Sequence, residues 1–144
     1  MSMPTTPLRL SVVFAARRSL ASIQSALECL LSQTAAPRIE LILSADSPEL
    51  LREAEDFLAP RSRFAQSRFL LHHTLNLARA RALSVAETTG DVVAFSEDHC
   101  FPEPNWAEEL LAAFESSANV QAAAPVMLNP NPETAVSRVQ FVFF

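Results

Sequence analysis

Short apolar runs alternate along the chain with stretches in which apolar residues recur every three or four positions. The short runs, rich in Val, Leu, Ile and Phe, are typical of buried strands, and the recurring stretches are typical of amphipathic helices. The pattern predicts strands at residues 8–14, 39–43, 68–72, 92–95 and 120–127, and helices at 20–32, from 48 onward, at 75–88 and at 105–116. This alternation predicts an α/β fold, Rossmann-like, with a mostly parallel sheet and helices on both faces.

Local signals support two of the helix boundaries. Ser47, Pro48 and Glu49 have the types preferred at the N-cap, the first position and the first turn of a helix. Gly90, the single glycine of the chain, is predicted to end the third helix.

A parallel sheet also predicts where a ligand binds. In open α/β sheets ligands bind outside the carboxyl ends of the strands, near the point where the strand order reverses. The segments that follow the predicted strands are residues 15–19, 44–47, 73–76 and 96–102. We expect the binding site among them.

Composition limits the class of protein. The 144 residues suit a single domain and leave no room for a second one of ordinary size. Sixteen acidic against eleven basic residues give a net charge of −5, which excludes the basic surface typical of nucleic-acid binding.

The expected setting is a reduced, cytoplasmic one. Cys29 and Cys100 are the only cysteines, and they do not have the spacing of a disulfide framework or of a Cys-x-x-Cys pair. No apolar run approaches the ~20 residues of a membrane-spanning helix, so no integral membrane segment is predicted.

One segment carries a family resemblance. It reads Asp-Val-Val-Ala-Phe-Ser-Glu-Asp-His-Cys-Phe-Pro-Glu-Pro-Asn-Trp over residues 91–106. With Gly90 before it, it resembles the central signature of family 2 glycosyltransferases, which have the GT-A fold. Glu97, Asp98 and His99 occupy the positions of the family's Asp-x-Asp motif. Upstream, Asn76 and the Ala80-Arg81 pair resemble a second stretch of the family, and the resemblance covers roughly residues 8–128.

The resemblance implies a GT-A-like domain that transfers a sugar from a nucleotide-sugar donor to an unidentified acceptor. Glu97 and His99 would bind a divalent cation, and Asp98 would contact the donor diphosphate, with Asp46 and Arg81 as secondary donor contacts. Such a cation neutralises charge that grows on the departing nucleoside diphosphate. Because imidazole is a better ligand for Mn²⁺ than for Mg²⁺, His99 favours Mn²⁺.

The chain departs from the family pattern at several positions. Glu97 and His99 replace the two aspartates of the motif, and Ala45 stands where an Asp usually contacts the base. Arg17 and Arg18 lie where the family has Pro-x-Tyr-Asn, and an ordinary solvated loop is the favoured interpretation of that pair. These departures leave the identity of the donor open.

Structural interpretations stand beside the functional ones. The Glu97–His99 triplet would then be a polar loop, Asp46 a turn or N-cap residue and Arg81 an exposed helical residue. His72 and His73 have no partner at metal-site spacing and are interpreted as structural. Cys100 beside His99 suggests zinc, but adjacent residues rarely bind one tetrahedral ion.

The competing function is a truncated or degenerate module of the same fold, non-catalytic, that binds a nucleotide or a partner. In the family the acceptor site and the catalytic base lie in a second half, which this chain is expected to lack. The resemblance therefore implies a single GT-A-like domain over residues 1–144, with a core at about 8–128 and with 129–144 as the start of a missing or docking region. We therefore expect the chain alone to transfer sugar poorly. The apolar end, Val139 to Phe144, is expected to dock on the sheet or to mediate self-association.

Overall fold

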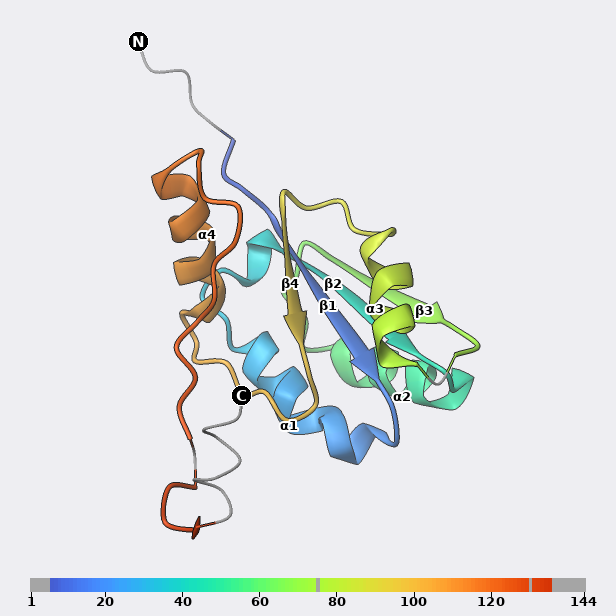
Figure 1. Ribbon diagram of the computed structural model, residues 1–144. Helices are drawn as coiled ribbons and strands as arrows, with labels where there is room; N and C mark the ends of the chain where they lie inside the picture. The colour runs from blue at the N-terminus through green and yellow to red at the C-terminus, as the bar shows by residue number, and fades with distance from the viewer. Residues whose placement is uncertain (1–5, 75, 130, 136–144) are drawn as a thin grey trace.

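The computed structural model describes residues 6–74, 76–129 and 131–135 (Figure 1). Its strands are β1 (Leu10–Ala16), β2 (Ile39–Ala45), β3 (Gln66–Leu71) and β4 (Val92–Ser96). Its α-helices are α1 (Leu20–Leu31), α2 (Pro48–Leu58), α3 (Leu77–Val85) and α4 (Trp106–Ser116), and a short 3-10 helix, η1 (Ala36–Arg38), precedes β2. The predicted elements up to residue 116 are therefore present, with ends that differ by a few residues.

The strands form one parallel sheet in the order β3-β2-β1-β4, which confirms the predicted α/β class. β1 is central, with Ala16 opposite Ala45 of β2 and Phe14 opposite Ser96 of β4. Because all strands run in one direction, their carboxyl ends meet at a single edge of the sheet. The chain order reverses between β1 and β4, and this edge is where such sheets bind ligands.

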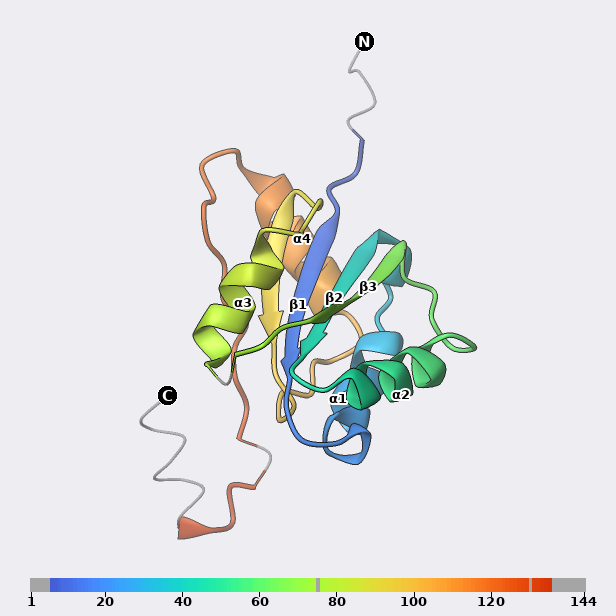
Figure 2. The same cartoon turned by 90° about the vertical axis from the view of Figure 1, so that its right-hand side faces the viewer.

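Helices cover the two faces of the sheet unequally. α1, α2 and α4 pack on one face, and α3 lies on the other (Figures 1 and 2). Successive side chains of a strand point to opposite faces. Leu10, Val12 and Phe14 of β1 are fully buried in the apolar cluster formed with α1, α2 and α4.

The predicted start of α2 is confirmed. Ser47 is the N-cap, and its Oγ accepts a hydrogen bond from the Leu50 N–H at 3.2 Å. Pro48 occupies the first helical turn, where the absence of its N–H has no cost, and Glu49 lies beside it. This cap directs the chain from the carboxyl end of β2 into α2.

The predicted role of Gly90 is wrong. α3 ends at Val85, and Gly90 lies in the turn before β4 without a positive φ. A Cβ there would lie 2.6 Å from Ser11 Oγ and 2.9 Å from the Arg9 carbonyl oxygen. Glycine is required because the turn passes against β1, and the Gly90 N–H donates to Ser11 Oγ at 2.9 Å.

The predicted strand at residues 120–127 is also wrong. After α4 the described chain has no regular structure in this segment (Figure 1). Val126 is 87% exposed and Leu128 is 78% exposed, so these side chains are not packed against the sheet. The run is apolar enough for a buried strand, but a strand also requires a neighbour that completes its hydrogen bonds.

Two further expectations concern the ends and the membrane. The apolar segment from Val139 to Phe144 lies outside the described residues. Among the helices of the described chain, none is long and apolar enough to span a bilayer.

Candidate functional site at the carboxyl edge

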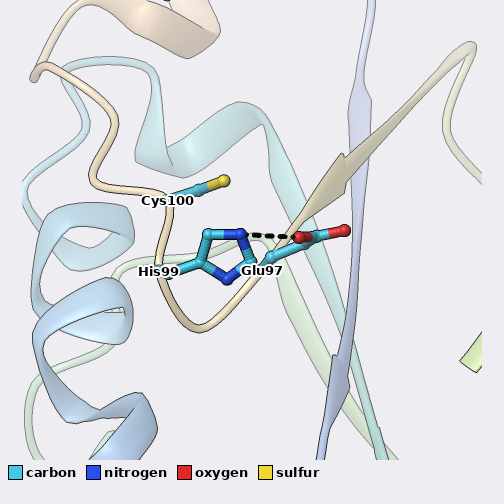
Figure 3. A group of neighbouring side chains, drawn as sticks. All are labelled: Glu97, His99 and Cys100. Atoms are coloured by element: carbon cyan, nitrogen blue, oxygen red, sulfur yellow. Dashed lines mark ion pairs between the residues drawn. The ribbon is translucent and has the colours of Figure 1, made fainter. Parts of the chain in front are cut away.

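The Glu97–His99 triplet lies in the loop that follows β4, at the carboxyl edge of the sheet. β4 ends at Ser96, and a tight turn begins at once, with the Cys100 N–H donating to the Glu97 carbonyl oxygen at 3.1 Å. This turn folds His99 and Cys100 back toward the Glu97 side chain (Figure 3).

Glu97 is the centre of the charged group. One carboxylate oxygen forms an ion pair with Arg81 of α3, and the other lies 3.1 Å from His99 Nε2. His99 Nδ1 lies 2.9 Å from Asp98 Oδ1. Since only an imidazolium has two N–H donors, a neutral His99 would donate to one carboxylate and leave its other nitrogen as an acceptor or metal ligand.

The donor set fits a metal ion. Glu97, His99 and Cys100 offer an oxygen, a nitrogen and a sulfur atom that lie within 4.8 Å of one another. Burial and the nearby carboxylates of Glu97 and Asp98 raise the pKa of the Cys100 thiol above its usual value. An imidazole and a thiolate suit transition metals better than Mg²⁺, which prefers oxygen ligands.

Asp46 lies at the same edge but apart from this group. It follows Ala45, the last residue of β2, and β1 separates β2 from β4. Two strand spacings correspond to about 10 Å between backbones. A single extended ligand could reach both Asp46 and Glu97, whereas one metal ion could not.

Arg81 joins α3 to the edge. Its Nη2 pairs with Glu97, and it lines a cavity of about 410 Å³ together with Ala82, Val85 and Phe95. Its Nε is buried and has no hydrogen-bond partner among the described residues. The guanidinium therefore retains a donor beside the carboxylate that it neutralises.

Sequence reasoning assigns no functional role to two residues near the site. The pattern disfavours Cys100 as a metal ligand, yet the turn after β4 brings its sulfur to Glu97 and His99. It predicts a structural role for His72, yet both ring nitrogens of His72 are buried without a partner in the described chain. For His72 the available signal is a polar residue directly after an apolar strand, whereas Cys100 lies further along the loop that follows β4.

The fold and the edge define a class of protein. It is an α/β domain in which a charged loop that could hold a metal ion follows β4, at the carboxyl edge where the strand order reverses. A family model described as "Glycosyl transferase family 2" matches residues 11–141. The chain belongs to glycosyl transferase family 2. No curated protein matches it.

Solved structures of glycosyltransferases share its fold. A crystal structure of S. aureus TarS aligns with a TM-score of 0.65 and 13% identity, over 85% of this chain and 24% of TarS. TarS 1-349 in complex with UDP gives a TM-score of 0.64 and 14% identity, over 85% of this chain and 40% of that one. The mannosyltransferase PcManGT from Pyrobaculum calidifontis, in complex with GDP-Man and Mn²⁺, aligns with a TM-score of 0.53 and 15% identity. The alignment covers 66% of this chain and 28% of PcManGT.

These similarities confirm the GT-A fold. The chain spans between 24% and 41% of the length of the TarS structures that it matches. The part that this chain shares with these structures includes its parallel sheet.

Proposed function

We propose that this chain is the nucleotide-sugar-binding part of a glycosyltransferase. Glu97 and His99 hold a divalent cation, Asp98 contacts the donor diphosphate, and Asp46 and Arg81 make further donor contacts. TarS was solved with UDP and PcManGT with GDP-Man and Mn²⁺, which supports a nucleotide-sugar donor and a divalent cation. The acceptor is a second, unidentified substrate.

One observation carries the proposal. The turn after β4 gathers oxygen, nitrogen and sulfur donors within 4.8 Å at the edge of the sheet where such folds bind ligands. A divalent cation held there would neutralise the charge that grows on the departing nucleoside diphosphate.

The residues of the chain have separate tasks. Arg81 offsets the negative charge of Glu97, so the loop accepts an anionic ligand more readily than two unpaired carboxylates would. Opposite unit charges 4 Å apart attract by roughly 4 kcal/mol at an effective dielectric near 20. Asp46 follows β2, about two strand spacings from β4, and would contact the far end of an extended donor.

Isothermal titration calorimetry tests the proposal. We expect UDP or GDP to bind more tightly with Mn²⁺ than with Mg²⁺, and least tightly without a metal. Loss of a ligand in Glu97→Gln or His99→Ala should weaken the Mn²⁺-dependent affinity by at least about 10-fold.

Glu55→Gln provides the matched control, because Glu55 is an exposed glutamate on α2, away from this edge. It should bind like the unmodified chain. Equal affinity with and without metal would show that the triplet is not a cation site.

A non-catalytic module of the same fold is the second candidate. Phe95 is 54% exposed and Val93 is 36% exposed on the sheet face beside α3, which is an unusual surface for a chain that acts alone. In this case the site would bind a nucleotide, or the exposed face a partner, without transfer.

A transfer assay separates the two candidates. We expect the 144-residue chain to show little turnover with a panel of nucleotide sugars and acceptors, because positioned acid–base help contributes about 10²–10⁴-fold and orientation of the acceptor contributes more. A family 2 glycosyltransferase of known donor and acceptor is the positive control for the assay. Turnover by the 144-residue chain at a rate comparable to that of the control enzyme would indicate that the base lies within these residues.

A cytoplasmic setting is part of the proposal. Cys29 and Cys100 are both free thiols in the structure. Reduced cysteines are usual in that compartment.

A further inference from the structure

The side chain of Gln33 is fully buried between the end of α1 and the start of α4. Gln33 follows Ser32, the C-cap residue of α1. Its Nε2 donates hydrogen bonds to the Cys29 carbonyl oxygen at 3.0 Å and to the Glu103 carbonyl oxygen at 2.8 Å. Its Oε1 accepts one from the Ala107 N–H at 2.9 Å. The carboxamide therefore joins the end of α1 to residues 70 and 74 positions further along the chain.

These bonds supply a cap that α4 does not have of its own. Asn105 occupies the N-cap of α4, but its side chain makes no capping hydrogen bond. The first N–H groups of a helix have no partner within the helix, and leaving a buried one unpaired is costly. Ala107 is fully buried in the first turn, and Gln33 Oε1 accepts its N–H. The start of α4 is therefore fixed by a residue that follows α1.

The neighbouring residue, Thr34, adds two bonds to the same region. Its N–H donates to the Pro104 carbonyl oxygen at 2.8 Å, and its Oγ1 donates to Glu108 Oε2 at 2.8 Å. Gln33 and Thr34 together therefore hold two successive carbonyl groups of the loop between β4 and α4, those of Glu103 and Pro104.

The segment between this contact and the Glu97 group is stiff. Pro102 and Pro104 each have a φ angle fixed by the ring, and the residue before each proline is restricted to extended conformations. Residues 101–104 therefore have little rotational freedom. Directly before them, the Cys100 N–H closes the turn on the Glu97 carbonyl oxygen at 3.1 Å. A shift at the contact with α1 is thus passed on to this turn.

We propose that Gln33 is a positioning residue for the loop that carries Glu97 and His99. It fixes the far end of this loop and so keeps the carboxylate and the imidazole together, with Glu97 Oε2 and His99 Nε2 3.1 Å apart. The inference rests on the proposed role of these two residues in holding a divalent cation. Gln33 makes its hydrogen bonds to other groups, and it acts through the backbone of the loop.

Mn²⁺ binding by the full chain tests the proposal. Electron paramagnetic resonance measures the free ion, and Gln33→Met keeps the length of the side chain while it removes its hydrogen bonds. We expect the Mn²⁺ affinity to fall roughly 2- to 30-fold, the range of coupling carried by residues that contact neither ligand. Ile23→Val is the control, because it removes a methylene from a fully buried residue of α1. It should lower the urea midpoint but leave the Mn²⁺ affinity within about 2-fold.

Pro104→Ala tests the same route without a change in the core. Pro104 is exposed, and alanine keeps the carbonyl group that accepts from Thr34. Because the segment becomes less stiff, the Mn²⁺ affinity should fall, by a smaller factor than in Gln33→Met, with little change in the urea midpoint. Pro60→Ala, at an exposed proline after α2, is the matched control and should bind Mn²⁺ like the unmodified chain.

The ring signals of His99 provide a readout that a loss of stability alone does not change. In nuclear magnetic resonance spectra recorded without metal, Gln33→Met should shift these signals, and Ile23→Val should leave them in place.

The outcomes separate the positioning role from the cation site. Unchanged Mn²⁺ affinity and unchanged His99 signals in Gln33→Met would overturn the positioning role and leave the cation site standing. If Gln33→Met does not fold, equal affinities in Pro104→Ala and Pro60→Ala would overturn it instead. No Mn²⁺ binding by the unmodified chain would overturn the cation site, and the His99 signals would then decide whether Gln33 positions the loop.

Discussion

The two faces of the sheet are built from different side chains. On the face covered by α1, α2 and α4, β1 presents Leu10, Val12 and Phe14, all fully buried and apolar. On the face covered by α3, the buried side chains include Ser11 of β1 and Glu40 of β2. The first face therefore gains its stability from apolar burial, and the second contains polar groups that must be paired.

β4 shows the same difference within one strand. Val92 and Ala94 are buried on the first face, whereas Val93 and Phe95 are exposed on the second. The α3 face is thus incompletely covered, and it also holds Arg81 and a cavity of about 360 Å³ that Ser44 and His72 line. The apolar core and the open, partly polar surface therefore lie on opposite faces of the same sheet.

The largest effect is expected on the apolar face. Phe14→Ala removes a fully buried aromatic ring from the centre of the sheet. Such a change leaves a cavity in a close-packed core and costs about 3–5 kcal/mol of unfolding free energy. Urea denaturation followed by circular dichroism measures the loss.

Phe95→Ala is the matched control on the other face. Phe95 is 54% exposed in β4, the strand next to β1, so its truncation should change the free energy of unfolding far less. Equal losses in the two variants would show that the α3 face is as tightly packed as the opposite one, and the comparison would fail.

The sequence predicts the strands and the helix starts that build the apolar core well. Apolar runs at 8–14, 39–43 and 92–95 are strands in the structure. In the first two, burial on both faces of a parallel sheet leaves a nearly continuous apolar pattern. The Ser47–Pro48 start of α2 is predicted for an equally local reason, since the cap depends on residues adjacent in sequence.

Non-local requirements explain the two errors. The segment at 120–127 has the composition of a strand, but composition does not reveal whether another strand lies alongside it. Gly90 follows a helical pattern, but its role comes from Ser11, which is 79 positions away in sequence. Neither contact can be inferred from a local window.

For the candidate site too, some features can be predicted from the sequence and others cannot. That Asp46 and Glu97 share an edge follows from strand direction alone. The Arg81–Glu97 ion pair and the approach of Cys100 to His99 depend on side-chain placement in the turn after β4. Their roles as donor and metal contacts stay predictions.

The polar face depends on the pairing of Glu40. Its carboxylate accepts hydrogen bonds from Ser11 Oγ at 2.5 Å, from the Thr89 N–H at 2.8 Å and from Thr89 Oγ1 at 2.9 Å. Arg68 Nε lies 3.9 Å away. This network links β1 and β2 to the turn that contains Gly90, so the buried charge is satisfied on all sides.

A smaller and pH-dependent effect is therefore expected from Glu40→Gln. Burial alone would raise the pKa of Glu40, but the hydrogen bonds from Ser11 and Thr89 and the charge of Arg68 outweigh it and hold the pKa below its ordinary value of 4.5. Glutamine keeps one acceptor and loses the charge, so at pH 7 the variant should be about 1–3 kcal/mol less stable.

The sign of the pH dependence follows from the lowered pKa. Ionised Glu40 contributes stability above pH 4.5, the ordinary value, and loses it as the pH falls through the lower value of the folded state. Urea midpoints measured from pH 7 to pH 3 should therefore converge for the unmodified chain and Glu40→Gln at the acid end. Glu55→Gln, on an exposed glutamate, should follow the unmodified chain throughout. A difference between Glu40→Gln and the unmodified chain that stays constant into acid would show that the Glu40 network acts through packing and not through its charge.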